Sequence, residues 1–287
     1  MSVDPKRLLR ELGLPKGLEL DLAEMSPFGE TNSVYLCEGR FRGSFVEAFL
    51  KIADRTTQSL ENERFVLDRV SVSDIPVPFV ITSGGGSKPF LLLSKLRGIM
   101  LWDRIDPHRA HYEKTSVIEN LRAYGEMLAR IHALEFDWPA QPRARFEGLI
   151  GEENVAESQF QNLVAWIDQN PQEPTRRTFV HGDFNTANVL VDGGAISGVI
   201  DWEFAGLGWK EYELAWALRA RIHFMNSAAE RDAVLSGYQT SGRFDERQLQ
   251  WCEVLNYLHF AYWSGDSNPE YRRFALARAE AVATVGT

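Results

Sequence analysis

Three side chains with oxygen donors, Asp183, Asn188 and Asp201, lie close together in the chain around two short apolar runs. The runs are separated by Asp192-Gly193-Gly194, and two strand-like runs joined by such a turn indicate a β-hairpin. Asp183 and Asn188 precede the first run, and Asp201 follows the second. We therefore expect the three side chains at one end of a tight hairpin.

Oxygen donors in this arrangement suit phosphoryl transfer. Mg²⁺ takes carboxylate and amide oxygens while keeping waters and phosphates, so Asn188 and Asp201 are candidate metal ligands. A further carboxylate, Asp183, is placed to accept a proton from a hydroxyl. Phosphoryl transfer needs such a set, because the metal neutralises the phosphates and a base orients the nucleophile. The alternative is that Asp183 and Asn188 only form a turn and that Asp201 only caps a strand.

The spacing His181-Gly182-Asp183-x4-Asn188 is followed by the strand pair and by Ile200-Asp201-Trp202-Glu203. This pattern resembles the catalytic segment of the aminoglycoside phosphotransferase and choline kinase-like family. It is also similar to the H-R-D-x4-N and D-F-G elements of protein kinases. Gly182 stands in place of the protein-kinase Arg, and Trp202-Glu203 in place of Phe-Gly. Both departures are usual among the small-molecule kinases.

The resemblance implies an α+β, protein-kinase-like fold with two lobes. The first lobe, residues 1–96, is expected to bind the nucleotide and to contain an antiparallel sheet and one helix. The second lobe, residues 97–287, is expected to be mainly helical, to carry the catalytic hairpin and to bind the acceptor. Apolar residues at helical spacing in the second half agree with this division.

The resemblance also implies an ATP- and Mg²⁺-dependent transfer of the γ-phosphoryl group to a hydroxyl of a small molecule. In this reaction Asp183 is the catalytic base, and Asn188 and Asp201 bind the metal. These roles require that the three side chains converge beside the terminal phosphate of the nucleotide.

Lys51 is the expected phosphate-binding lysine of the first lobe. It lies in a strand predicted at residues 45–52, and the alternative is a surface lysine on an edge strand. A glutamate of the helix predicted at residues 58–70 is expected to pair with it. Glu63 fits the helical register better than Glu61, but both remain candidates because they lie on the same helix.

Two further segments are expected to contact ATP. Gly29, Thr31 and Asn32 lie in a glycine turn between two predicted strands, where backbone N–H groups can cover phosphates. The composition of this turn also fits a plain hairpin. Ser94 and Leu96 end an apolar strand at the expected hinge between the lobes, and the resemblance implies that the backbone there hydrogen-bonds the adenine edge.

Three polar residues of the second half receive supporting roles. His181 is expected to hold the catalytic loop by hydrogen bonds and not to titrate in catalysis. His132, near the end of a helix predicted at residues 113–134, is interpreted as a packed residue that bonds backbone, with a catalytic base as the alternative. Glu213 stands where the family commonly has an aspartate that braces the loop. Its side chain is long enough to reach the loop, and its bracing role stays open.

The acceptor is the part of the reaction that the sequence leaves open. Glu203, Asp266 and Trp263 are candidate substrate contacts, as anionic or aromatic partners of an amine. The aromatic residues near them also fit an ordinary helix core. Helices are predicted there at residues 214–221, 228–240, 245–263 and 268–283. The family includes kinases of aminoglycosides, of choline-like amines, of homoserine and of fructosamine, and each remains an alternative.

Composition and charge indicate which partners and which cellular location to expect. The chain has 287 residues and a formal net charge of -9 at pH 7. No basic stripe is evident, so a nucleic-acid partner is not expected. No apolar run spans a bilayer and no signal peptide is recognised, so no membrane partner is expected. Cys37 and Cys252 fit no disulfide or metal spacing, which indicates buried thiols in a reducing compartment and a cytoplasmic location. The oligomeric state is not indicated.

Two other classes of protein fit parts of the pattern. A non-catalytic ATP-binding protein with the same fold is disfavoured, because every carboxylate and amide that the chemistry needs is present. A protein kinase is disfavoured by Trp202-Glu203 and by the lack of an A-P-E-like element after Asp201. The favoured hypothesis is therefore a small-molecule kinase.

Overall fold

The computed structural model describes Leu12, Leu14 and residues 16–25, 32–53, 58–85, 88–135, 158–172, 177–264 and 267–284. Its contacts divide the chain into two compact units. The first unit consists of residues 1–98 and 197–204, and the second unit consists of residues 99–196 and 205–287. The segment 197–204 carries Asp201, so this residue folds with the N-terminal part of the chain, whereas the sequence places all of 97–287 in the second lobe.

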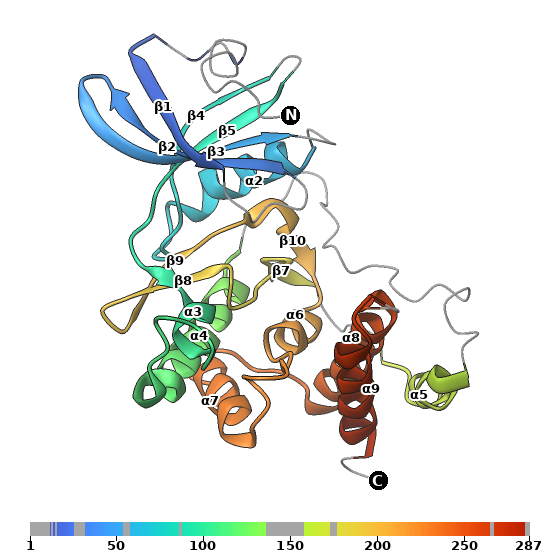
Figure 1. Cartoon of the computed structure of the whole chain (residues 1–287). Coiled ribbons are helices and arrows are strands. Elements are labelled where there is room, and N and C mark those ends of the chain that lie inside the picture. The colour runs from blue at the N-terminus through green and yellow to red at the C-terminus, as the bar shows by residue number, and fades with distance from the viewer. Residues whose placement is uncertain are drawn as a thin grey trace. The chain divides into compact units, whose positions relative to one another are not determined.

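The first unit contains a five-stranded antiparallel sheet of order β1-β2-β3-β5-β4 (Figure 1). Its strands are β1 (Leu18–Met25), β2 (Asn32–Phe41), β3 (Ser44–Ala53), β4 (Val80–Gly84) and β5 (Phe90–Ser94). Lys51 of β3 lies opposite Val34 of β2 and Leu91 of β5. It is therefore on a central strand, and the alternative of an edge-strand surface lysine is wrong.

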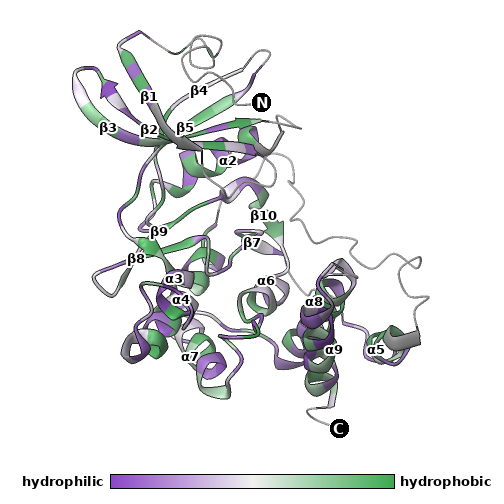
Figure 2. Cartoon of the chain, viewed as in Figure 1, coloured by the Kyte–Doolittle hydropathy of each residue, from purple (hydrophilic) through white to green (hydrophobic). Residues whose placement is uncertain are grey.

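Apolar residues of the inner strands form the core of this sheet. β5 is buried along its whole length and is coloured as hydrophobic in Figure 2. A central strand with both faces covered reads as a continuous apolar run, as β5 does, and not as an alternating one. The cluster on one face comprises Leu12, Leu18, Cys37, Ala48, Leu50, Ile52, Phe90 and Leu92.

Helix α2 (Gln58–Val70) brings a carboxylate into the first unit. Its apolar buried residues recur at helical spacing and are Leu60, Val66, Leu67 and Val70. Glu63 lies on the same face and is fully buried, whereas Glu61 is exposed. Residues three and four positions apart share one side of a helix, so the apolar pattern that buries the helix also buries Glu63.

The second unit is mainly helical (Figure 1). Its helices are α3 (Leu101–Ile105), α4 (Val117–His132), α5 (Ser158–Gln169), α6 (Lys210–Ala217), α7 (Ala228–Tyr238), α8 (Glu246–Ser264) and α9 (Pro269–Thr284), with a short 3₁₀ turn, η1 (Lys114–Ser116). Helix α6 begins at Lys210 and not at the predicted residue 214. Its N-cap, Trp209, makes no side-chain capping bond, so the usual sequence signal for a helix start is missing.

Helices α4 and α7 approach each other closely through glycine. A Cβ atom on Gly125 would lie 2.0 Å from the carbonyl oxygen of Val234, and one on Gly237 would lie 1.9 Å from that of Arg122. Any side chain at either position would force the two backbones apart. This contact fixes α4, whose last residue, His132, takes part in the site described below.

In the second unit, short strands lie on either side of the loop 181–188, which carries Asp183. β7 (Thr178–Val180) pairs with β10 (Gly206–Gly208), and β6 (Ile99–Met100) pairs with β8 (Val189–Asp192). β9 (Ala195–Val199) neighbours β8 in the sheet order β6-β8-β9, so the predicted hairpin is present. Its turn uses Gly193 and Gly194, both with positive φ, the conformation that favours glycine.

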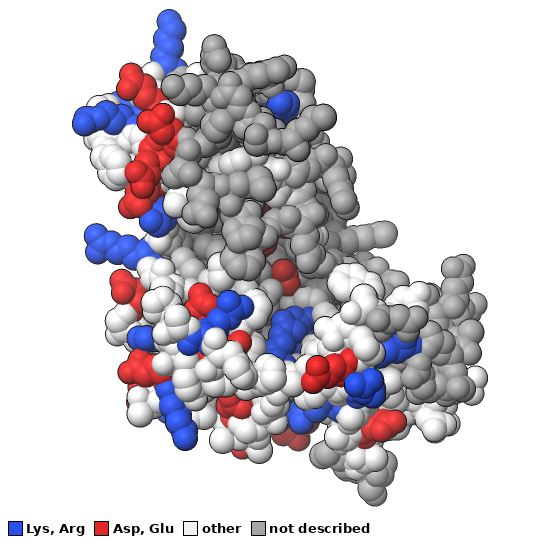
Figure 3. Space-filling model, viewed as in Figure 1, with Lys and Arg blue, Asp and Glu red and all other residues white. Residues whose placement is uncertain are grey.

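The surface and the cysteines agree with the composition. Lysines and arginines are interspersed with acidic side chains on the face drawn in Figure 3. None of the helices in the described ranges has both the length and the hydropathy of a membrane span. Cys37 and Cys252 are free and buried, as expected.

Candidate active site

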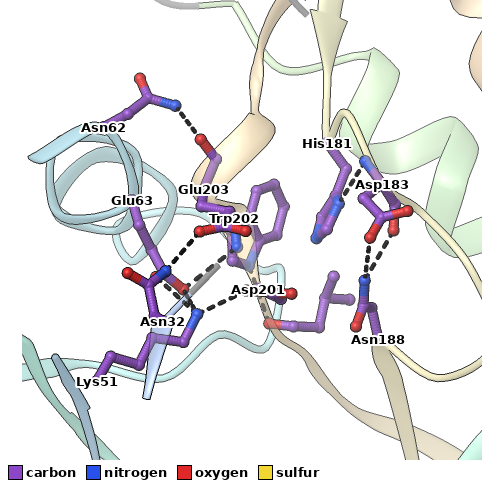
Figure 4. Close-up of polar contacts among 11 residues, drawn as sticks. Asn32, Lys51, Asn62, Glu63, His181, Asp183, Asn188, Asp201, Trp202 and Glu203 are labelled. Carbon is purple, nitrogen blue, oxygen red and sulfur yellow. Dashed lines mark hydrogen bonds and ion pairs between the residues drawn. The ribbon is translucent and has the colours of Figure 1, made fainter. Parts of the chain in front are cut away.

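Lys51 lies at the centre of a buried ion cluster in the first unit. Its Nζ donates to both carboxylate oxygens of Glu63, at 2.9 and 2.7 Å, and to Oδ1 of Asp201 at 2.6 Å (Figure 4). Lys51 is 9% exposed and Glu63 is fully buried. Glu63, and not Glu61, is thus the glutamate of α2 that pairs with the strand lysine.

Two carboxylates share the single ammonium of this cluster. Burial raises the pKa of Glu63 to about 7, because desolvation and the neighbouring Asp201 together outweigh the attraction of Lys51. Burial opposes the charge on Lys51, but Asp201 and Glu63 favour it and raise the pKa of the ammonium. Lys51 is therefore charged at neutral pH.

The backbone holds Asp201 in an uncommon conformation. Its φ is 67°, in the left-handed region that non-glycine residues rarely adopt and that is concentrated at functional sites. The next residue, Trp202, is fully buried; its N–H donates to Oε1 of Glu63 at 3.3 Å and its indole Nε1 donates to the carbonyl of Val199 at 2.9 Å. These bonds fix the turn, η3 (Trp202–Phe204), while the Asp201 side chain keeps 34% exposure.

Glu203 extends this network toward β2. Its carboxylate accepts from Nδ2 of Asn32 at 2.8 Å, and its carbonyl accepts from Nδ2 of Asn62 at 2.9 Å. Glu203 is only 6% exposed. The carboxylate of Glu203 is therefore buried in the first unit against Asn32, and its acceptor contact stays a prediction. Asn32 itself, a predicted nucleotide contact, was expected within the glycine turn but is the first residue of β2.

In the second unit, Asp183 lies on the loop between β7 and β8. Its Oδ1 accepts from Nδ2 of Asn185 at 3.1 Å and from the indole Nε1 of Trp216 at 3.0 Å. Its Oδ2 accepts from Nδ2 of Asn188 at 3.2 Å. Three donors from the loop and from α6 thus orient the carboxylate. Asn185 and Trp216 were not predicted as site residues.

Asn188 keeps an oxygen for a cation. Its Nδ2 donates to the carbonyl and to Oδ2 of Asp183, at 2.9 and 3.2 Å, which leaves the amide oxygen as an acceptor. Asp201 provides a partly exposed carboxylate in the first unit. The described residues contain no group of three or more His, Cys, Asp or Glu suited to a metal. Mg²⁺ takes carboxylate and amide oxygens and completes its shell with phosphates and water, so each of these residues has the donor type that the ion needs.

Glu213 braces the catalytic loop from α6. Its Oε2 accepts from the backbone N–H of His181 at 2.9 Å and its Oε1 accepts from that of Gly182 at 2.5 Å. Gly182 has a φ of 82°, so glycine at this position allows the turn that directs both N–H groups at the carboxylate. The sequence left open whether Glu213 braces the loop, and these bonds show that its longer side chain reaches it.

His132 supports that carboxylate. Its Nε2 lies 2.9 Å from Oε2 of Glu213 and its Nδ1 lies 2.8 Å from the hydroxyl of Tyr238. Glu213 only accepts, so Nε2 is the protonated nitrogen. Burial alone would raise the pKa of Glu213, but the hydrogen bonds from the His132 ring and from the backbone N–H of His181 help to hold it below its ordinary value. His132 is packed, as expected, but its ring bonds side chains, so the expected backbone partner is wrong.

Aromatic residues pack under the same loop. Nδ1 of His181 accepts from the backbone N–H of Asp183 at 3.2 Å, which confirms that His181 holds the loop by hydrogen bonding. Phe184 contacts the His181 ring edge to face and stacks on Tyr124 of α4, with centroids 4.6 Å apart. The Tyr124 hydroxyl donates to the carbonyl of Phe184 at 3.2 Å. The loop is therefore held on both sides of Asp183.

The remaining predicted nucleotide contacts lie outside this network. The amides of Ser94 and Lys95 donate to the carbonyls of Phe79 and Glu47, both at 3.0 Å. The next backbone N–H along this segment, that of Leu96, donates to no carbonyl oxygen of the described residues. Gly29 and Thr31 lie outside the described residues.

Of the predicted acceptor contacts, Trp263 alone is described in the second unit. It is 54% exposed and contacts Phe260 edge to face, and Phe260 in turn packs against Trp216 with centroids 4.9 Å apart. A chain of aromatic rings thus leads from Trp263 to the residue that bonds Asp183. Asp266 lies outside the described residues.

The sequence also matches a known family. The model of the phosphotransferase enzyme family matches residues 26–252. The chain belongs to this family. The matched span contains every residue of the two networks described above, from Asn32 to Tyr238. The match confirms the family resemblance that the sequence motif predicted.

Individual relatives are similar to the chain to different extents. A homoserine kinase of Zymomonas mobilis is 23% identical over 271 residues, which cover 85% of this chain and 76% of that protein. A hygromycin-B 4-O-kinase of Escherichia coli is 43% identical, but over 53 residues only, 18% of this chain and 15% of that protein.

Solved structures confirm the protein-kinase-like fold. Aminoglycoside phosphotransferase APH(4)-Ia superposes with a TM-score of 0.64 at 20% identity, over 98% of both chains. Macrolide 2'-phosphotransferase MphH of Brachybacterium faecium gives 0.65 at 17% identity, over 96% of both chains. The fold is α+β with an antiparallel sheet in the N-terminal part and helices in the C-terminal part, as predicted.

Membership of the family establishes the reaction class. The chain is a phosphotransferase. This class agrees with the two side-chain networks, one around a buried lysine and one around an oriented carboxylate.

Proposed function

We propose that the protein phosphorylates the hydroxyl of a small amino alcohol, with Asp183 as the catalytic base. The observation that carries the proposal is the orientation of Asp183 by Trp216, Asn185 and Asn188 on a loop braced by Glu213. A carboxylate fixed in this way can align an acceptor hydroxyl and take its proton as the phosphoryl group is transferred.

The buried lysine cluster is proposed to bind the nucleotide. Lys51, held by Glu63, would contact the phosphates, and the Leu96 amide would donate to the adenine edge. Gly29, Thr31 and Asn32 would cover the phosphates, as the resemblance implies. We further propose that residues 1–96 act as the nucleotide lobe and residues 97–287 as the catalytic and acceptor lobe.

Mg²⁺ is proposed to be held by the amide oxygen of Asn188 and the carboxylate of Asp201. When bound, the ion neutralises phosphate charge and polarises the transferred group. Asp201 now pairs with Lys51, so a cation beside Asp201 would release part of that ion pair and free the ammonium for phosphate. The need for ATP and Mg²⁺ and the free buried thiols support a cytoplasmic location.

The acceptor class rests on the extent of sequence similarity. The similarity to a homoserine kinase covers most of this chain, whereas that to a hygromycin kinase is confined to 53 residues. Homoserine is an amino acid that carries an amine and a hydroxyl, as an amino alcohol does, and a solved neighbour is an aminopropanol kinase. An aminoglycoside acceptor is the second candidate, because APH(4)-Ia superposes on nearly the whole chain.

An acceptor screen with matched variants tests the proposal. ATP consumption is measured with amino alcohols, aminoglycosides, macrolides and sugars, for the wild type and for Asp183→Asn. We expect turnover with an amino alcohol, and a loss of about 100-fold or more in kcat for Asp183→Asn with little change in ATP affinity. Normal kcat in this variant would refute the base assignment, and turnover of aminoglycosides only would refute the acceptor class.

A further inference from the structure

Arg219 is a buried cation close to the proposed catalytic base. It lies just after Leu218, the C-cap of α6, and is 7% exposed. Its guanidinium lies 4.4 Å from the ring centroid of Trp216, the residue that donates to Asp183, and 3.7 Å from that of Phe260. Two aromatic rings thus hold the cation beside the carboxylate that is proposed to receive the acceptor hydroxyl.

The guanidinium has donors without acceptors. Its Nε and Nη1 are buried and have no hydrogen-bond partner in the described chain. Arginine carries five N–H donors in a planar fork, and leaving such donors unpaired away from water is costly. Contact with aromatic faces attracts the cation but does not supply the missing acceptor oxygens.

A half-buried arginine of the same unit, Arg231, is paired within the protein. Arg231 of α7 donates to Glu253 of α8 through Nε at 3.3 Å and through Nη2 at 2.7 Å. This pair satisfies the guanidinium within the protein. Within the described residues Arg219 is not paired with a carboxylate in this way: Asp183 acts on it as a nearby charge and already accepts from three other donors.

The charges around Arg219 favour an additional anion. Burial and the neighbouring Arg221 lower the pKa of Arg219 to about 9, so the group remains charged at neutral pH. Arg221 donates to the hydroxyl of Tyr271 at 3.2 Å. The groups that act on Arg219 are Arg221, Tyr271, Asp183 and Tyr124. Among these groups of the described chain, the two arginines outnumber the one carboxylate.

We propose that Arg219 binds a carboxylate on the acceptor, and that the enzyme therefore prefers hydroxylated acids, such as hydroxy amino acids, over neutral or purely cationic alcohols. This inference rests on the proposed function, because it assumes that the acceptor hydroxyl lies at Asp183. A guanidinium matches a carboxylate in charge and in planar geometry, and it would gain the acceptors that the protein does not provide. The aromatic side chains of Trp216 and Phe260 would then orient the guanidinium and not bind a substrate ammonium group.

Matched acceptor pairs test the proposal. L-homoserine is compared with L-homoserine amide and with 3-aminopropan-1-ol, and 4-hydroxybutyrate is compared with its amide. We expect the wild type to favour the acid of each pair. Arg219→Gln should lower kcat/KM for the acids by about 10- to 100-fold, mainly through KM, the effect of losing hydrogen bonds to a charged group. The same variant should leave the KM for ATP and the kcat/KM for the amides within about twofold.

Two further variants control for folding. Arg219→Lys keeps the charge and should retain part of the preference for acids. Arg243→Gln changes an exposed arginine that bonds only backbone carbonyls, at Gln239 and Gly242, and should leave every kinetic constant unchanged. Equal losses for acids and amides in Arg219→Gln would mean that Arg219 acts on the phosphoryl group or on the fold, and would overturn the proposal.

Failure of this inference can be told apart from failure of the proposed function. If the wild type phosphorylates neutral alcohols as well as their acids, the kinase assignment stands and the role of Arg219 is wrong. If no pair is turned over, calorimetric titration of L-homoserine and its amide into the wild type with MgADP decides. Binding of the acid alone, lost in Arg219→Gln, supports the inference even without transfer, and equal or absent binding of the two overturns it.

Discussion

The carboxylate of Glu213 offers a direct test of how the second unit positions Asp183. It is 1% exposed and accepts from the backbone N–H groups of His181 and Gly182 and from Nε2 of His132. Glu213→Ala leaves three buried donors unpaired. Removing one partner of a buried charged network costs about 3–5 kcal/mol of the free energy of unfolding. We expect a loss near the middle of that range.

Activity should fall with stability, and for a separate reason. His181 and Gly182 precede Asp183 directly, so losing their anchor lets the base move, and a shift of about 1 Å costs on the order of 100-fold in rate. Glu213→Gln keeps one acceptor oxygen and the size of the side chain. It should lose about 1.5–3 kcal/mol, the range for hydrogen bonds to a charged group, and a smaller part of kcat.

Urea unfolding at pH 7.5 and steady-state kinetics with a substrate from the acceptor screen measure both effects. Glu253→Ala is the matched control, because Glu253 is a buried glutamate paired with Arg231 away from the loop. It should reduce stability but leave kcat unchanged. The reasoning is refuted if Glu213→Ala loses less than about 1 kcal/mol, well under the cost of a broken buried network, or if Glu253→Ala lowers kcat as much as Glu213→Ala does.

Three further predictions follow from the contacts. Glu63→Gln should raise the KM for ATP by about 10-fold or more, because the bonds that hold Lys51 are charge-assisted, while Glu61→Gln should not change it; equal effects would mean that Glu63 does not position the lysine. Below about pH 4.5, the ordinary value for Glu213, stability should fall as protons bind, because the pKa of Glu213 is lower in the folded state than in the unfolded state. Unfolding followed from pH 6 to 3 should show a shallower loss for Glu213→Gln than for the wild type, and parallel curves would contradict this assignment. Gly125→Ala should lose about 1–3 kcal/mol by overpacking α4 against α7, whereas Gly85→Ala, where a Cβ meets nothing within 4 Å, should melt like the wild type in calorimetry.

The sequence predicted the parts of the site that lie on regular elements. The helical register of α2 placed Glu63 with Leu60 and Leu67, and the burial of that face decides between Glu63 and Glu61. The hairpin was readable because Gly193-Gly194 is a strong turn signal between two apolar runs. The start of α6 was missed, since Trp209 provides no capping side chain.

Contacts between distant residues could not be predicted in this way. Glu203 is an anionic residue near the motif, but its partner Asn32 lies 171 positions away and only the fold brings the two together. Trp216 and Arg219 likewise follow a helical pattern that fits an ordinary core. Trp216 is distinguished by its hydrogen bond to Asp183, and Arg219 by guanidinium nitrogens without a hydrogen-bond partner. Neither property can be inferred from residue spacing.

The most direct test of the central claim is a crystal structure of the protein with AMP-PNP and Mn²⁺ in place of Mg²⁺, because the anomalous signal of manganese locates the metal. We predict a manganese peak bound by the amide oxygen of Asn188 and the carboxylate of Asp201, with the triphosphate contacting Lys51 and its γ-phosphate facing Asp183. A metal that contacts neither residue, or a triphosphate remote from Lys51, would contradict the account.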